Sequence, residues 1–144
     1  MLKRHWRWAA VLGLAVLALV TAQVYAAMTA KTMGRYGGWA YYSAEVDLPA
    51  GARTEIVAAV AGKRIRVVAL MINANVAGTV TLESATTAIS GDINLAATGG
   101  FVLPPVPEES ARFYGWMDTA AGEALNATTV TCTIDGVLVF AVEQ

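Results

Sequence analysis

The sequence is poor in the residues that most enzymes use for catalysis. It has one histidine and one cysteine among 144 residues. His5 lies in an N-terminal segment with the pattern of a targeting sequence, so the rest of the chain cannot hold a histidine-based triad, general base or zinc cluster. Cys132 has no second cysteine to pair with, and its place in a predicted strand favours a buried, inert thiol over a nucleophile. We therefore expect a protein that is not an enzyme and that uses no metal or cofactor.

Charged residues are also few, at 15% of the chain against 56% hydrophobic residues. Removal of the first 26 residues would take away Lys3, Arg4 and Arg7 and leave 7 basic against 11 acidic residues, a net charge of -4. No basic patch accompanies this balance, so nucleic acid is not an expected partner. The length suits one domain and is too short for two ordinary ones.

Residues 1–26 have the pattern of a secretory signal peptide. Basic residues precede an uninterrupted apolar run from Ala9 to Val20, and Val24-Tyr25-Ala26 offers small residues at a cleavage site. The alternative is an uncleaved membrane anchor, because the apolar stretch extends to Ala30 and approaches the ~20 residues that span a bilayer. The sequence thus predicts an exported or periplasmic protein, or one held in the membrane through residues 9–30.

The folded module is expected at residues 39–144, after a flexible linker at residues 27–38. It is organised around Ala61 to Ser84, where an apolar run breaks at Asn73-Ala74-Asn75 and resumes after Gly78. Alternation and β-branched residues predict two long strands joined by a short loop. In the first of them, one face would carry Ile65, Val67, Ala69 and Met71, and the other Arg64, Arg66, Val68, Leu70 and Ile72.

Turn residues divide the remaining module into short strands. Proline at 104, 105 and 107 marks a loop or sheet edge, since proline donates no ladder hydrogen bond. Asp135-Gly136 is the strongest hairpin signal and predicts a type I′ turn, with Gly136 at positive φ, between strands at 124–134 and 137–143. The sequence therefore predicts an all-β fold, a β-sandwich or jelly roll of about eight or nine antiparallel strands preceded by an N-terminal hydrophobic helix.

From about Thr54 to Val142 the chain resembles a small all-β module of tailed phages and prophages, found in virion-associated or uncharacterised proteins. The resemblance rests on five segments: Gly62-Lys63-Arg64-Ile65-Arg66-Val67, Ala88-Ile89-Ser90-Gly91, Leu95-Ala96-Ala97-Thr98-Gly99-Gly100, Thr119-Ala120-Ala121-Gly122-Glu123-Ala124-Leu125-Asn126 and Gly136-Val137-Leu138-Val139-Phe140. It implies a structural role on a virus particle, as a head-decoration or tail-associated module.

The predicted interface residues are two basic and three apolar: Arg64, Arg66, Leu138, Phe140 and Val142. The arginines, with Lys63, are either strand-edge charges that discourage unwanted pairing or contacts for an acidic partner. The strand at 137–142 is apolar on both faces, and a lone sandwich would expose one of them. We therefore expect a homo-oligomer, with a trimer as the first guess among cyclic forms.

Other candidate sites have simpler interpretations. Asp92 with Asn94, and Asp118 with Glu123, could offer oxygen ligands to calcium, but neither spacing matches a calcium loop and turn capping is the preferred role. Asn126 opens a glycosylation sequon, which matters only in a eukaryotic secretory host. Six aromatic residues could line a sugar-binding face, or could pack in the core and interfaces: Trp39, Tyr41, Tyr42, Phe113, Tyr114 and Trp116.

Two functions remain open from the sequence. The first is a virion-associated structural module that forms a homo-oligomer or docks on capsid or tail proteins. The second is an exported or membrane-anchored β-sandwich that acts in adhesion or binds a ligand such as a carbohydrate.

The sequence also predicts that residues 39–144 fold without the first 38 residues, because the strand signals all lie after Gly38. Circular dichroism and melting of this fragment should show cooperative unfolding. Its oligomeric state should be compared with that of residues 27–144, since Met28, Met33 and Tyr36 could instead pack on a neighbouring subunit. A fragment without a cooperative transition would contradict the prediction, and a folded monomer beside an oligomeric longer form would make the linker an assembly arm.

Overall fold

The computed structural model describes residues 31–36, 39–105 and 115–143, and these ranges form β-strands and no helix. One sheet, here sheet A, contains β1 (Lys31–Tyr36), β2 (Trp39–Leu48), β4 (Ile65–Ala74), β8 (Gly100–Leu103), β9 (Met117–Asp118) and β11 (Ile134–Glu143). Sheet B contains β3 (Arg53–Val57), β5 (Gly78–Ser84), β6 (Thr87–Ala88), β7 (Ile93–Leu95) and β10 (Leu125–Val130). The neighbouring strands pair antiparallel, which confirms the all-β prediction. The predicted N-terminal helix lies outside the described residues.

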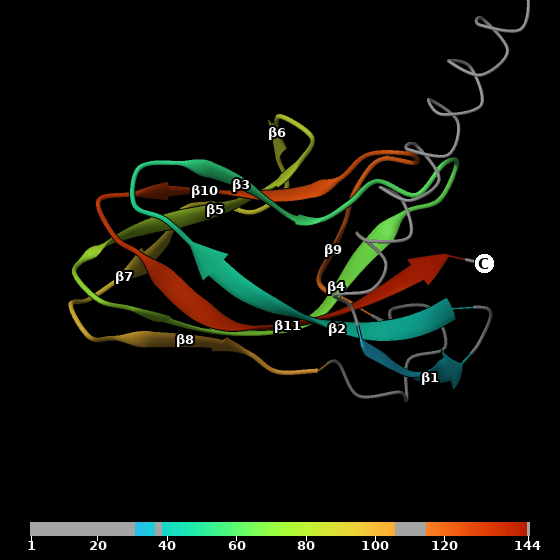
Figure 1. Cartoon of the computed structure of the whole chain (residues 1–144), viewed down its shortest axis with the longest axis horizontal. Helices are drawn as coiled ribbons and strands as arrows, with labels where there is room; N and C mark the ends of the chain where they lie inside the picture. The colour runs from blue at the N-terminus through green and yellow to red at the C-terminus, as the bar shows by residue number, and fades with distance from the viewer. Residues whose placement is uncertain (1–30, 37–38, 106–114, 144) are drawn as a thin grey trace, which may run out of the picture.

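The strands pair in a nested order that is typical of a jelly roll. In sheet A, β2 pairs with β11 and β4 with β8; in sheet B, β3 pairs with β10 and β5 with β6. The resulting orders are β1-β2-β11-β4-β8 and β3-β10-β5-β6. Figure 1 shows the two sheets as two layers, with β3, β10 and β5 in the upper layer and β2, β11 and β8 in the lower.

Apolar side chains from both sheets form one core cluster between the layers. Its fully buried members include Leu48, Ile65, Leu70 and Leu138 from sheet A, and Leu82 and Leu125 from sheet B. The rings of Tyr42 and Phe140 stack at its margin, with their centroids 5.4 Å apart. The space between the sheets is therefore occupied by packed side chains.

A β-bulge in β4 changes which of its residues face the core. Val67 pairs with Phe140 and Ala69 with Val139, so Val68 is an extra residue without a partner on β11. The predicted alternation is right up to Val67 and wrong after it, because one inserted residue exchanges the two faces of a strand. Leu70 and Ile72 are consequently buried, and Met71 is 55% exposed.

The predicted hairpin at Asp135-Gly136 is wrong, because both residues lie inside the continuous strand β11. Gly136 pairs with Val46 on one side and Ile72 on the other. A side chain at Gly136 would overlap the carbonyl oxygen of Met71 and come within 2.9 Å of Ile72 Cα. The glycine is thus needed for close approach of two strands, and it is not among the residues with positive φ.

The chain passes from β10 to β11 through a corner at residues 131–133, where Thr131 has a φ of 66°. Cys132 is fully buried in this corner, which confirms its predicted burial although it lies between strands and not within one. The backbone N–H of Thr133 donates to Asn75 Oδ1 at 2.9 Å. This contact ties the corner to the connection between β4 and β5.

Part of the predicted linker is a strand. Residues 31–36 form β1, which extends sheet A by pairing with β2 from Lys31 opposite Ser43 to Tyr36 opposite Trp39. Removal of β1 would expose one edge of β2 but would leave its pairing with β11 intact. The other linker residues, 27–30 and 37–38, lie outside the described ranges.

The close approach at Gly136 predicts that Gly136→Ala destabilises the fold by about 1–3 kcal/mol, the usual cost of forcing atoms into a packed site. Gly91→Ala is a matched control, because a Cβ there would meet nothing within 4 Å. The control should change stability by less than ~1 kcal/mol. Urea unfolding of both variants measures the difference, and equal midpoints would contradict this account of Gly136.

Candidate functional surfaces

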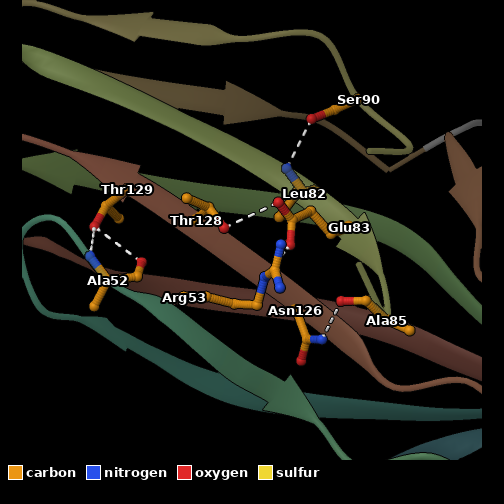
Figure 2. A network of polar contacts seen from close by, with 9 residues as sticks. All are labelled: Ala52, Arg53, Leu82, Glu83, Ala85, Ser90, Asn126, Thr128 and Thr129. Atoms are coloured by element: carbon orange, nitrogen blue, oxygen red, sulfur yellow. Dashed lines mark hydrogen bonds and ion pairs between the residues drawn. The ribbon is translucent and has the colours of Figure 1, made fainter. Parts of the chain in front are cut away.

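The filled interior places the candidate functional groups on the two outer faces of the sandwich. The outer face of sheet B carries a network of polar contacts, which Figure 2 shows. The Glu83 carboxylate accepts hydrogen bonds from Arg53 Nε at 2.6 Å and from Thr128 Oγ1 at 2.9 Å. These contacts link β3, β5 and β10 through one carboxylate whose two oxygens are both occupied. Glu83 therefore holds β3, β5 and β10 of sheet B together.

Two further contacts in Figure 2 have structural roles. Thr129, which is buried, accepts at Oγ1 from the backbone N–H of Ala52 at 3.4 Å, as Figure 2 shows. Its Oγ1 also donates to the Pro49 carbonyl at 2.6 Å, so Thr129 holds the turn before β3. Asn126 Nδ2 donates to the Ala85 carbonyl at 2.6 Å from a strand in the middle of sheet B. The nitrogen that would carry a glycan is thus already engaged in a hydrogen bond.

Arg66 is held by its own chain. Its Nε and Nη2 donate to the two oxygens of Asp118 at 2.6 and 2.7 Å, a bidentate pair on the outer face of sheet A. The hydrogen bond from Arg66 to Asp118 raises the pKa of Arg66, against the opposing effect of burial. A Cβ at Gly115 would overlap the Arg66 side chain, so the backbone there packs directly on it. Arg66 thus has an acidic partner within its own chain, whereas Arg64 is exposed.

The turn at residues 118–123 joins the two sheets. Ile65 and Thr119 exchange hydrogen bonds, with Ile65 N 3.0 Å from Thr119 Oγ1 and Thr119 N 2.9 Å from the Ile65 carbonyl. Ser84 Oγ donates to the Glu123 carboxylate and accepts from Ala120 N at 2.8 Å. The turn therefore fastens the start of β4 to the end of β5.

The carboxylates that were considered as calcium ligands accept hydrogen bonds from side chains of the same protein. Asp118 binds Arg66, Glu123 accepts from Ser84, and Asp92 accepts from Thr81 Oγ1 at 2.7 Å. Among the described residues, no group of three or more histidine, cysteine, aspartate or glutamate side chains could hold a metal ion. The geometry agrees with structural roles for these carboxylates.

The outer face of sheet A carries an apolar strip. Met71 pairs directly with Val137 on one side and Val102 on the other, and the three side chains are 55%, 43% and 62% exposed. Val139 and Ala69 form a second, half-buried row beside them. We call these five residues the apolar strip.

The apolar strip lies on the side of β11 opposite to the predicted interface residues. Leu138 and Phe140 are buried in the core, and Val142 packs against it half-buried, so these three predicted interface residues are not on an exposed face. Both sides of the strand are apolar, and the sequence alone could not distinguish them. Met71 was missed as an outward residue because the bulge at Val68 was not foreseen.

The predicted aromatic residues do not form one face, because Tyr41 and Tyr42 are neighbours on β2 and point to opposite sides of sheet A. Tyr42 stacks on Phe140 and packs against the core, so it is unavailable to a sugar. Trp116 is exposed, with its Nε1 donating to the Pro104 carbonyl at 2.8 Å. Phe113, Tyr114 and the Trp39 side chain lie outside what the structure describes.

Comparisons with known proteins show little. No family model matches the chain, and no curated protein matches it. Among solved structures, a cupin domain of Bordetella pertussis is 10% identical, with 80% of this chain and 92% of that chain covered and a TM-score of 0.29. A proposed mannose-6-phosphate isomerase of Ralstonia eutropha is 8% identical, with 80% and 83% covered and a TM-score of 0.28. These TM-scores are too low to support an argument about fold or function.

The structure offers no helix that could cross a bilayer within residues 31–36, 39–105 and 115–143. The predicted signal or anchor at residues 1–26 lies before these ranges.

Two ion pairs among the described residues predict different coupling energies. Arg66–Asp118 is bidentate with side chains 19% and 27% exposed, whereas Arg53 of the Arg53–Glu83 pair is 47% exposed. A double-mutant cycle with Arg66→Ala and Asp118→Ala should give a coupling of about 1–2 kcal/mol, against less than ~1 kcal/mol for Arg53→Ala and Glu83→Ala. Thermal unfolding of the four single and two double variants measures both values. A larger coupling at Arg53–Glu83 would show that exposure does not decide the order.

Proposed function

We propose that this protein is a non-enzymatic structural module that assembles with copies of itself through the outer face of sheet A. The observation that carries the proposal is the apolar strip, in which Val102, Met71 and Val137 form one exposed row across three paired strands. Exposed apolar side chains that are contiguous on a sheet face are typical of a contact surface.

The interior and the polar face support the non-enzymatic part of the proposal. A jelly roll that binds a small molecule between its sheets needs a cavity, and here the core residues of both sheets fill that space. On sheet B, both oxygens of the Glu83 carboxylate are engaged by Arg53 and Thr128. A structural role requires neither a pocket nor a titrating side chain.

For the biological setting we propose a virion-associated role, as a decoration or tail-associated module with capsid or tail proteins as further partners. The proposal rests on the segment resemblance to phage modules, and jelly rolls are a common capsid architecture. An export signal or anchor at residues 1–26 instead favours an exported, periplasmic or membrane-anchored module that acts in adhesion or ligand binding. Fold alone does not separate the two settings.

Light scattering on residues 27–144 at micromolar concentration tests the assembly role. We expect a mass above that of the monomer, with a trimer as the sequence-based first guess. Met71→Glu should shift the protein towards monomer, because a charge in the strip must be desolvated on association. Val130→Glu is the matched control, since Val130 is an exposed valine at the end of β10 in sheet B. A monodisperse, folded monomer before any substitution would refute the proposed function.

A further inference from the structure

The apolar strip is small for a contact between two independent molecules. Its five outward residues cover roughly 160 Å², from about 4.8 Å between strands and about 6.6 Å between outward residues of one strand. Stable interfaces between separate proteins bury about 800 Å² on each partner, so a second copy must cover more of sheet A than the strip. A segment of the same chain needs less contact, because its tether gives it an effective concentration on the order of millimolar. The strip alone therefore suits an occupant from the same chain.

Three exposed carboxylates border the apolar strip at one end. Glu45 pairs with Val137 and so flanks the strip on β2. Asp47 and Asp135 lie directly opposite each other in the next outward row, where like charges repel. Neither ion pair of the described residues involves these three carboxylates, which we call the acidic border. The neighbouring strand β1 adds one cationic residue, Lys31, so this region keeps an excess of negative charge. A matching occupant is apolar, with several basic residues at one end.

The chain contains a segment with this composition. Residues 9–20 are an uninterrupted apolar run, and three basic residues precede it: Lys3, Arg4 and Arg7. These residues lie outside the described ranges, which begin with β1 at Lys31, on the edge of sheet A beside β2. β11 is two strands away from β1, roughly 10 Å at about 4.8 Å a strand, and the residues from 21 to 30 can span up to about 33 Å. The apolar run can thus reach the strip.

We propose that residues 1–20 bind the apolar strip of their own chain, with their basic residues beside the acidic border, and keep this face closed to second copies. The inference rests on the proposed assembly role and names what regulates the same surface. Cleavage after the segment, or its transfer into a bilayer, opens the face. Assembly then follows processing or insertion of the segment.

Cysteine labelling of the full chain tests the proposal. Met71→Cys lies in the strip and Val130→Cys lies on sheet B, and the native side chains are almost equally exposed, at 55% and 54%. The chain is made in a cell-free system without membranes, kept at nanomolar concentration and treated with a polyethylene glycol maleimide, which shifts the labelled protein on a gel. Met71→Cys should react at least about fivefold more slowly than Val130→Cys, because the tethered segment covers it. The unsubstituted chain reports the background from Cys132, which is buried.

A charge reversal distinguishes this segment from any other cover. Glutamate at the three basic positions leaves the apolar run intact and places like charges beside the acidic border, so Met71→Cys should then react at close to the rate of Val130→Cys. The three substitutions are Lys3→Glu, Arg4→Glu and Arg7→Glu. Arg64→Glu is the control, because Arg64 is exposed and lies outside the segment, and it should leave the labelling rate unchanged. Val137→Cys is a second strip position if Met71→Cys does not fold.

The outcomes separate this inference from the proposed function. Equal rates at Met71→Cys and Val130→Cys, or slow labelling that the charge reversal does not change, overturn the inference. Protection that rises with protein concentration shows that a second copy covers the strip, which overturns the inference and supports the assembly role. Light scattering on residues 27–144 tests assembly without the segment, so a monomer there overturns the assembly role and not the contact measured by labelling.

Discussion

The insertion of β11 between β2 and β4 is the constraint on which the rest of the fold depends. It lies along both neighbours for most of its ten residues, and its inward side chains complete the core of sheet A. β11 and β4 approach closely at residue 136, which has no side chain to meet the Met71 carbonyl. The same register sets the outer face, since it aligns Val137 with Met71 and Asp135 with Asp47.

The sequence predicted the class of fold well because its main signals are local. The two long strands around Ala61 to Ser84, the all-β class and the burial of Cys132 follow from alternation, turn residues and composition. The errors occur where a tertiary contact overrides a local signal. Asp135-Gly136 has the composition of a tight turn, yet two flanking strands hold it extended, and the glycine serves their packing.

The candidate surface was predicted less well than the fold, for a related reason. A bulge depends on how two strands pair, and nothing in residues 65–74 marks Val68 as the residue without a partner on β11. Because one extra residue reverses the faces, Met71 is exposed although the alternation placed it on one face with Ile65 and Val67, which are buried. On β11 both faces are apolar, so only the position of sheet B decides that Leu138 faces inwards and Val137 outwards.

The nested pairing also bears on how the chain folds as it is made. In sheet A, β2 and β4 have no pairing with each other, and both pair with β11, the last strand of the described residues. Sheet A therefore cannot close until β11 has been synthesised, and contacts between such distant segments form slowly. Until β11 is added, the edges of β2 and β4 that it covers stay unpaired, and unpaired strand edges are sites where chains aggregate.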